Sequence, residues 1–410
     1  MISLSDWPPH WAPVVEAFQA RHPNITIEHE VYPFRQLFEI IEVRMQGQSE
    51  DVDLMAVDVP LVASYSLRGY LKPLDEYFSA EELASRWVPS SGEAGRHDGK
   101  LMAAPLNTSA QYMYVNLGLF REAGIEPPPA LTADHETTVD EVVAGRWTWE
   151  QVVDAAKAMT ADTNGDGTPD VWGFSFDQVS RPYQILALPE SLEQPSISED
   201  GLTTAGYLDS PKWIQAATFY HDLFNGQPVS PKGVTPTDTP DLFATGKAAI
   251  WVGGEWNARR FSEAEGLEFG IAAHPYFANG RVATPTGSWH IGIPAFSQHP
   301  AEAGQFIQFV TADPEGSRLW FEHHVQFPAT VPLLEEIETA ETYGQFPASG
   351  WRLAATEART SAVPRPKTPG YLEFEDILAT TLEDIRNGAQ PAEALPGAVR
   401  RIDRALARYK

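Results

Sequence analysis

The sequence predicts a two-domain α/β protein with mixed sheets flanked by helices. Short strands and amphipathic helices alternate through its first half, a rhythm that favours a parallel or mixed sheet with helices on both faces. At 410 residues the chain exceeds what one ordinary hydrophobic core holds, so we expect two domains. No long linker divides it, which suggests domains joined by several short crossings.

Hydrophobic spacing predicts the N-terminal elements in order. Residues 2–4 open a first strand, residues 11–21 follow as a helix, and residues 25–31 alternate like a half-buried strand. A second helix is expected over 34–45. Its apolar residues recur at helical spacing and should face the core: Leu37, Phe38, Ile41 and Met45.

The later elements carry clearer boundary signals. A strand over 52–57 ends in Asp58, and residues 111–116 are typical of another strand. Thr148 should cap an amphipathic helix that runs to Met159. Two C-terminal helices are expected, over 372–386 and 398–409.

Composition excludes several classes of function. The net charge of −27, from 56 acidic and 29 basic residues, argues against nucleic acid or an anionic membrane surface as the main partner. No apolar run approaches the ~20 residues of a membrane helix. The absence of cysteine removes thiol catalysis, cysteine-bound metals and disulfides. The first residues lack signal-peptide features although a strand begins at once, so we expect a periplasmic or extracellular protein whose signal segment is absent from this sequence.

No catalytic signature stands out. The chain lacks the Gly-x-Ser-x-Gly elbow, the His-Glu-x-x-His zinc motif, a phosphate loop and a dinucleotide fingerprint. The adjacent His323 and His324 diverge on a helix and make a poor metal site. Because acids are abundant, a two-domain polysaccharide hydrolase or lyase stays open as the competing class.

One acidic turn resembles half of an EF-hand calcium loop. Within residues 162–170, side-chain oxygens occupy loop positions 1, 3, 5 and 9, glycine occupies position 6, and a backbone carbonyl is available at position 7. Position 12, where the bidentate acid belongs, is Gly173. A plain polar turn would favour the same residue types. We expect no required cofactor; a structural calcium ion is possible here, on Asp162, Asn164, Asp166, Thr168 and Asp170.

Aromatic side chains gather where strands end. A buried strand over 248–252 runs into a Gly-Gly pair and then Glu255 and Trp256. Glycine lets a ligand approach the backbone, so Trp256 would stack on a sugar while Glu255 binds hydroxyls; core packing is the alternative. Neighbours on an extended strand point opposite ways, so Glu255 should face away if Trp256 faces a ligand. The pattern recurs at five strand ends, where ligands of open α/β sheets bind.

Nine short landmarks follow one another along nearly the whole chain. Each alone is weak, and they lie at 15–27, 53–58, 69–75, 99–100, 114–128, 147–150, 246–250, 301–307 and 311–316. In this order they resemble the extracellular solute-binding proteins of ABC importers, specifically the carbohydrate-binding group that includes maltose-binding protein.

That resemblance implies the two-lobe periplasmic-binding-protein fold, with three hinge crossings and the ligand in a cleft between the lobes. The implied crossings lie near 107–112, 270–276 and 325–331. The N-terminal lobe would comprise 1–109 and 276–328, and the C-terminal lobe 110–275 and 329–410. The resemblance also implies a monomer that is not an enzyme. It would bind a mono- to oligosaccharide or glycoside with high affinity and present it to an ABC permease by hinge closure.

The resemblance also assigns ligand-binding residues. Asp58 matches an acid that binds sugar hydroxyls, and Trp256 and Tyr371 match stacking aromatics. Trp289, after Gly287, matches a cleft aromatic. Loop position adds His10, Asn107, Gln178 and Arg365, and the strand-end pattern adds Trp7 and His290. If His10, His290 and Arg365 converge, an anionic sugar derivative (a sugar acid, phosphate or sulfonate) becomes the alternative ligand.

Overall fold

The computed structural model describes residues 1–133, 137–226, 228–287, 289–324 and 326–410. They form two compact units built from discontinuous segments. Unit 1 comprises residues 1–109, 287–336 and 367–369, and unit 2 comprises residues 110–286, 337–366 and 370–410. The second and third unit boundaries fall later along the chain than the crossings expected at 270–276 and 325–331.

Unit 1 is built on a five-stranded mixed sheet in the order β2-β1-β3-β12-β6. Its strands are β1 (Ile2–Leu4), β2 (Glu30–Tyr32), β3 (Met55–Asp58), β6 (Ala104–Pro105) and β12 (Trp289–Gly292). β1 pairs in parallel with β2 and β3, whereas β12 pairs antiparallel with β3 and β6. β12 belongs to the second segment of unit 1, residues 287–336, so the sheet is complete only when this segment pairs with strands of the first segment. Its register places Trp289 opposite Asp58.

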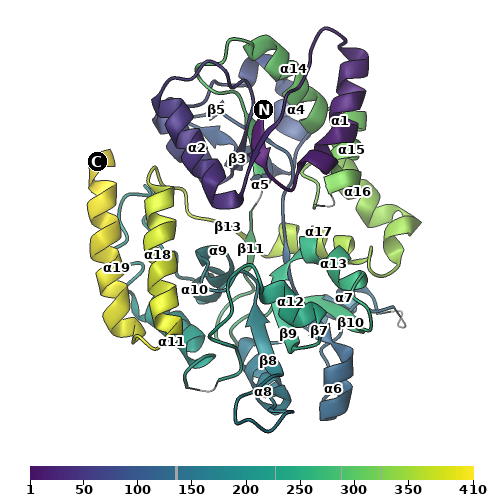
Figure 1. Ribbon diagram of the computed structural model, residues 1–410, viewed down its shortest axis with the longest axis vertical. Helices are drawn as coiled ribbons and strands as arrows, with labels where there is room; N and C mark the ends of the chain where they lie inside the picture. Colours follow the sequence, from purple (N-terminus) through teal and green to yellow (C-terminus); the bar gives the residue numbers. More distant parts are fainter. Residues whose placement is uncertain (134–136, 227, 288, 325) are drawn as a thin grey trace. The chain divides into compact units, whose positions relative to one another are not determined.

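Helices cover the unit 1 sheet, and α1 packs beside α15 (Figure 1). The stripe expected on α2 is confirmed, since its four predicted residues are the buried ones. The strand expected over 25–31 is wrong for most of its length, because only Glu30–Tyr32 pairs with β1. The remaining elements are α1 (Pro8–Arg21), α2 (Phe34–Gln46), α3 (Leu61–Leu67), η1 (Asp75–Tyr77), α4 (Ala80–Ser85), α5 (Pro89–Ala94), β4 (Arg96–His97), β5 (Lys100–Leu101), α14 (Pro300–Thr311), α15 (Pro314–His324) and α16 (Val331–Thr339), which runs past the boundary at 336.

Unit 2 contains a four-stranded sheet in the order β10-β7-β9-β8. Its strands are β7 (Gln111–Asn116), β8 (Trp172–Phe176), β9 (Ala248–Gly254) and β10 (Phe269–Ala273). β7 pairs antiparallel with β9 and β10, and β8 pairs in parallel with β9. β7 and β9 are buried along their whole length, which explains their nearly continuous apolar sequence. A separate parallel pair joins β11 (Thr284–Thr286) to β13 (Ala362–Pro364).

The helices of unit 2 include the C-terminal pair α18 and α19, which lie side by side (Figure 1). α19 begins at Pro391 rather than at 398, and it carries Pro396 inside its first turns. The cap expected on α8 is confirmed: the Thr148 side chain accepts the Gln151 N–H in a capping box. The helices are α6 (Leu117–Ala123), α7 (Val139–Ala144), α8 (Trp149–Met159), α9 (Pro182–Ile185), α10 (Ala187–Ser191), α11 (Pro211–Asp222), α12 (Thr239–Ala244), η2 (Glu255–Asn257), α13 (Ala258–Ser262), η3 (Glu341–Gly344), α17 (Gly350–Thr360), α18 (Tyr371–Arg386), α19 (Pro391–Leu406) and η4 (Ala407–Tyr409).

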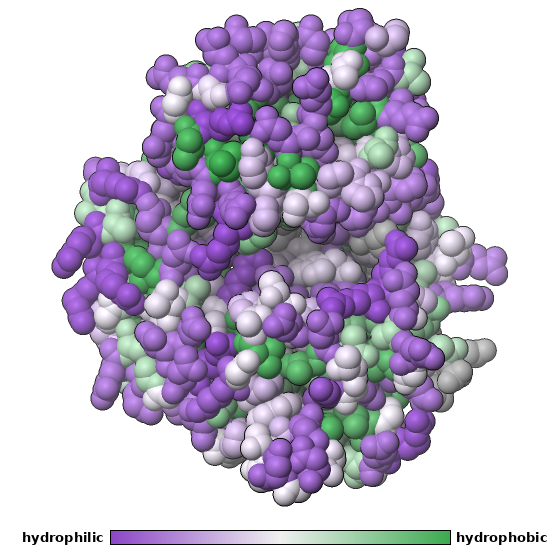
Figure 2. Space-filling model, viewed as in Figure 1, coloured by the Kyte–Doolittle hydropathy of each residue, from purple (hydrophilic) through white to green (hydrophobic). Residues whose placement is uncertain are grey.

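The surface is largely hydrophilic. In the face shown in Figure 2, apolar side chains are scattered among polar ones. Across the described part of the chain, no helix combines the length and the hydropathy that a membrane crossing requires.

Candidate functional site

Unit 1 holds an aromatic cluster, which we define as Trp7, Trp11, Trp289, Trp320, His10 and His324. Trp7 caps the start of α1 and is only 1% exposed. Its ring centroid lies 5.1 Å from that of Trp289, edge to face, and 4.9 Å from that of His324. The ring centroids of Trp11 and Trp320 lie 4.1 Å apart. Because most of these rings are buried against one another, Trp289 is the tryptophan that this cluster leaves partly exposed.

Two imidazoles in this cluster share one hydrogen bond. The Nδ1 atoms of His10 and His324 lie 2.8 Å apart, so one ring donates and the other accepts. His324 ends α15 and is buried, and that burial holds its pKa well below its usual value. The pair is therefore uncharged on at least one ring at neutral pH. No local pattern predicts this contact, because the two residues are 314 positions apart.

Three predicted residues lie beside Trp289. Asp58 ends β3 and is 4% exposed. The Asn107 N–H donates to the Trp289 carbonyl at 3.4 Å, and its side-chain amide donates to Gln326. The Gly287 N–H donates to the Ser109 hydroxyl at 2.7 Å. The end of β3, the start of β12 and the segment after β6 thus lie next to one another within unit 1.

His290 is placed differently from its neighbour in the sequence. It is fully buried, and its Nε2 lies 3.0 Å from the Ser91 carbonyl. This burial lowers the pKa of His290 to about 4. Successive side chains of a strand face opposite sides, so His290 lies across the sheet from Trp289. The structure therefore does not bring His290 together with His10.

Unit 2 holds an aromatic–arginine cluster, defined as Tyr183, Trp256, Tyr371, Arg181, Arg365 and Glu375. The rings of Tyr183 and Trp256 are nearly parallel, with centroids 6.4 Å apart and planes 16° from each other. The Arg365 guanidinium carbon lies 4.8 Å from the Tyr183 centroid and 5.9 Å from that of Tyr371. On the same tyrosine ring, the guanidinium carbon of Arg181 lies at 5.7 Å. Arg181 Nε is 3.5 Å from a Glu375 carboxylate oxygen.

The glycine pair at the end of β9 serves internal packing. A Cβ on Gly254 would lie 2.1 Å from the Trp256 ring, and a Cβ on Gly253 would lie 2.3 Å from the Trp251 ring and 2.5 Å from the Cβ of Asp177. We expected these glycines to admit a ligand, but in the structure they make room for three side chains of unit 2. Trp256 itself is half-buried.

Glu255 packs away from its aromatic neighbour. It is 2% exposed, and its carboxylate accepts the Ala110 N–H at 3.1 Å. Its own N–H donates to the Ala110 carbonyl at 3.1 Å. The segment before β7 is thus tied to the end of β9, which fixes the backbone that presents Trp256.

A polar loop over 177–181 follows β8 and supplies charge to the unit 2 cluster. Asp177 is 2% exposed, and its Oδ2 has no hydrogen-bond partner among the described residues. Burial raises the pKa of Asp177 to about 7, although the nearby Arg181 guanidinium acts to lower it. The Gln178 side-chain oxygen accepts from Arg181. The sequence analysis selected Gln178 and missed Asp177, Arg181 and Tyr183, although polar residues directly after a strand were the available signal.

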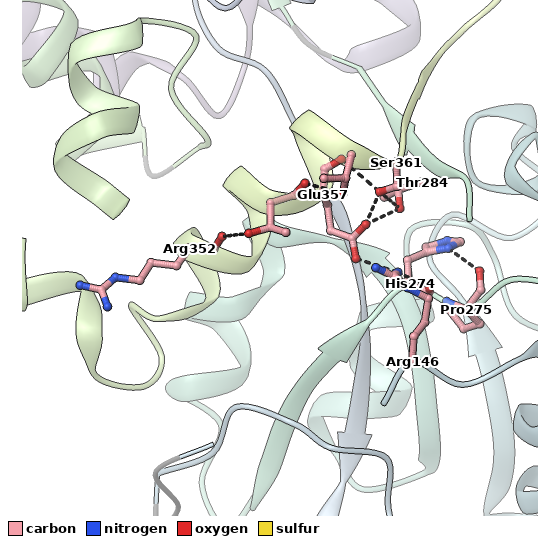
Figure 3. A network of polar contacts seen from close by, with 9 residues as sticks. Arg146, His274, Pro275, Thr284, Arg352, Glu357 and Ser361 are labelled. Carbon is pink, nitrogen blue, oxygen red and sulfur yellow. Dashed lines mark hydrogen bonds and ion pairs between the residues drawn. The ribbon is translucent and has the colours of Figure 1, made fainter. Parts of the chain in front are cut away.

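A second polar network lies inside unit 2. The Glu357 carboxylate is fully buried and forms an ion pair with Arg146 at 2.7 Å (Figure 3). It also accepts hydrogen bonds from the hydroxyls of Thr284 and Ser361. Arg146 donates in addition to the His274 carbonyl at 2.6 Å. This network anchors β11, the strand that directly precedes the unit boundary at residue 286.

The acidic turn over 162–170 directs its side chains toward its own backbone. Asp162 accepts the N–H groups of Gly165 and Gly167, both at 2.7 Å, and Asp170 accepts from Thr163. Within the residues that the structure describes, no group of three or more His, Asp or Glu side chains is arranged to hold a metal ion. Calcium binding by this turn stays a prediction.

Residues 5–316 match the family described as bacterial extracellular solute-binding protein. The chain belongs to that family. The family and its structural neighbours are transport binding proteins, not enzymes.

Relatives of this solute-binding protein cover nearly its whole length. The galactooligosaccharide-binding protein of Bacillus subtilis is 22% identical, over 94% of this chain and 83% of that protein. The sn-glycerol-3-phosphate-binding periplasmic protein of Pectobacterium atrosepticum is 22% identical, over 83% of this chain and 75% of that protein. An ABC substrate-binding protein of Listeria monocytogenes, solved in complex with cycloalternan, superposes with a TM-score of 0.83 at 21% identity, covering 99% and 98% of the two chains. This likeness confirms the predicted two-lobe binding-protein fold.

Proposed function

We propose that this solute-binding protein binds a carbohydrate outside the cytoplasm and delivers it, unchanged, to the permease of an ABC transporter. The single observation that carries the proposal is the near-parallel pair of Tyr183 and Trp256, with the guanidinium groups of Arg181 and Arg365 against the Tyr183 ring in unit 2. A sugar ring has an apolar CH face that packs on an aromatic ring and hydroxyls at its edge that need hydrogen-bonding groups. This cluster offers both.

Unit 1 adds a second set of groups of the same kind. Trp289 offers a partly exposed indole, and Asp58 and Asn107 lie beside it. The names of relatives agree in chemistry, since one binds galactooligosaccharides and another was solved with cycloalternan. We propose a monomer, as the resemblance implies.

An anionic sugar derivative is the second candidate. Two guanidinium groups, those of Arg181 and Arg365, lie within 6 Å of the Tyr183 ring, and a relative is named for sn-glycerol-3-phosphate. The Glu375 carboxylate lies next to Arg181 and offsets one of these positive charges, whereas Asp177, whose pKa burial raises to about 7, offsets the other only in part at neutral pH. The carbohydrates named for two relatives make a neutral saccharide the first candidate.

A thermal-shift screen tests the proposal. The panel contains maltotriose, other neutral mono-, di- and oligosaccharides, sugar acids and sugar phosphates. A ligand at 100 times its Kd stabilises the native state by ~2.7 kcal/mol, which raises the melting temperature measurably. The proposal predicts a shift with a neutral saccharide. A shift confined to sugar phosphates or acids supports the second candidate, and conversion of a glycan during incubation supports the hydrolase or lyase class instead.

A further inference from the structure

The loop over 177–181 contains two residues in the left-handed backbone region. Gln178 has φ of 43° and Ser180 has φ of 67°, and neither is glycine. A side chain makes this conformation unfavourable, so it persists where surrounding contacts impose it. Two such residues within five positions therefore require contacts that hold the loop in place.

The first contact comes from α12. The Gln178 N–H donates to the Thr239 hydroxyl oxygen at 3.1 Å. Thr239 is 1% exposed, and its hydroxyl donates in turn to the Pro236 carbonyl at 3.2 Å. This second bond orients the hydroxyl so that its lone pair faces the loop.

The second contact comes from α11. The hydroxyls of Ser180 and Tyr220 lie 3.1 Å apart, and both are buried. The Tyr220 ring packs against Phe224 at 5.2 Å and Phe176 at 6.3 Å, which fixes its position. Burial raises the pKa of Tyr220 to about 12, so its phenol keeps its proton across the physiological range.

The loop carries Arg181, a charged residue of the aromatic–arginine cluster, and the buried Asp177. Asp177 precedes the first left-handed residue, and Arg181 follows the second. We propose that Tyr220 and Thr239 are positioning residues, which hold this strained loop so that Asp177 stays buried and Arg181 is presented to the ligand. The inference rests on the proposed function, because it assigns the loop to ligand binding.

The decisive variant is Tyr220→Phe, which removes only the hydroxyl. With maltotriose as probe, or with the panel saccharide that gives the largest shift, we expect Kd to rise about tenfold, the size of effect expected from one lost buried hydrogen bond. Far-ultraviolet circular dichroism should stay unchanged. The matched control is Tyr112→Phe, which removes another buried phenol of unit 2, bonded to the Gly350 carbonyl, and should bind as the native protein does.

A rescue variant separates positioning from general destabilisation. Glycine adopts positive φ without strain, so Ser180→Gly relieves the need for the Tyr220 contact. The double variant Tyr220→Phe with Ser180→Gly should therefore recover most of the native affinity. Unchanged binding in Tyr220→Phe, an equal loss in Tyr112→Phe, or failure of the glycine variant to recover affinity would each overturn the proposal.

A ligand-free measurement keeps this test independent of the proposed function. The pKa of the Asp177 carboxyl can be followed by carbon-13 NMR. We expect it to fall from about 7 toward its ordinary value in Tyr220→Phe, because a released loop exposes the carboxyl to water, and to rise again in the double variant. An unchanged pKa contradicts positioning. Absence of binding by the native protein to every sugar contradicts the proposed function alone.

Discussion

The two units use aromatic residues in contrasting ways. In unit 1 the rings of the aromatic cluster pack on one another around His324, which burial keeps uncharged. In unit 2 the aromatic–arginine cluster combines two nearly parallel rings with two guanidinium groups and nearby carboxyls. Unit 1 thus packs most of its aromatic rings into the interior and leaves Trp289 partly exposed, whereas unit 2 places aromatic rings beside charged groups.

The same contrast extends to the interior of each unit. Unit 2 buries the ion pair of Arg146 and Glu357, with side chains 6% and 0% exposed. Among the ion pairs that the structure describes in unit 1, none has both side chains below a tenth exposed. Changes to buried charge should therefore act on unit 2 more strongly than on unit 1.

The largest effect is expected from Arg146→Met. The substitution leaves the Glu357 carboxylate buried without its cation, which should lower the free energy of unfolding by about 3–5 kcal/mol. Urea denaturation followed by circular dichroism measures the change. The control is Arg121→Met, whose partner Glu268 is exposed, and which should have little effect. Equal losses in the two variants would remove the distinction between buried and exposed charge.

The pH dependence of stability should run in opposite directions for Asp177 and His290. Folding raises the pKa of Asp177, so the contribution of this carboxyl to the free energy of unfolding is fully present below about pH 4 and is lost as the pH rises to 7. Folding lowers the pKa of His290, so the contribution of this imidazole to the free energy of unfolding is fully present above pH 6.5 and is lost as the pH falls to about 4. Each effect is up to roughly 3–4 kcal/mol at 1.36 kcal/mol per pKa unit.

Two variants isolate these contributions. Relative to the native protein, Asp177→Asn should gain stability as pH rises from 4 to 8, and His290→Gln should gain stability as pH falls from 7 to 4. Melting temperatures recorded across this range measure both. If the two differences change in the same direction with pH, the assignment of the buried groups is wrong.

Ligand affinity should depend on Trp256 more than on other half-buried tryptophans. Trp256→Ala removes one ring of the parallel pair and should weaken saccharide binding about 100-fold, or ~2.7 kcal/mol, while the protein stays folded. Trp147→Ala is the matched control, since Trp147 is half-buried in unit 2 and packs on Phe120. An undiminished thermal shift in Trp256→Ala would remove this residue from the site.

The smallest effect is expected at the acidic turn. Asp162→Ala removes the acceptor of three loop N–H groups on an exposed turn and should cost about 1 kcal/mol or less. If the turn also binds calcium, millimolar calcium should raise the melting temperature of the native protein and leave that of Asp162→Ala unchanged. A native melting temperature that does not respond to calcium would contradict the predicted calcium site.

Much of the fold follows from local sequence signals. The period of α2, the capping box of α8 and the strand over 111–116 depend on neighbours within a few positions, and the structure confirms them. The strand expected over 25–31 fails because alternation alone does not provide a partner, and only three residues reach β1. The order of weak landmarks along the chain was enough to identify the family.

The site was harder to predict from the sequence than the fold, because its geometry depends on contacts between residues that are far apart along the chain. The bond between His10 and His324 spans 314 positions, and the contact of Ser180 with Tyr220 spans 40. The role of Gly253 and Gly254 was misjudged, since only coordinates show that Trp256 and Asp177 fill the space beside them. A pattern of aromatic and polar residues indicates that a site exists, but not which side chains turn inward.

Isothermal titration calorimetry of the native protein with the saccharide panel decides whether this protein binds a carbohydrate without converting it. Each titrated sugar is afterwards recovered and analysed by chromatography. We predict saturable binding of a neutral saccharide at one site per chain, with the sugar recovered unchanged. No saturable heat with any member of the panel, or recovery of a shortened or modified sugar, would contradict it.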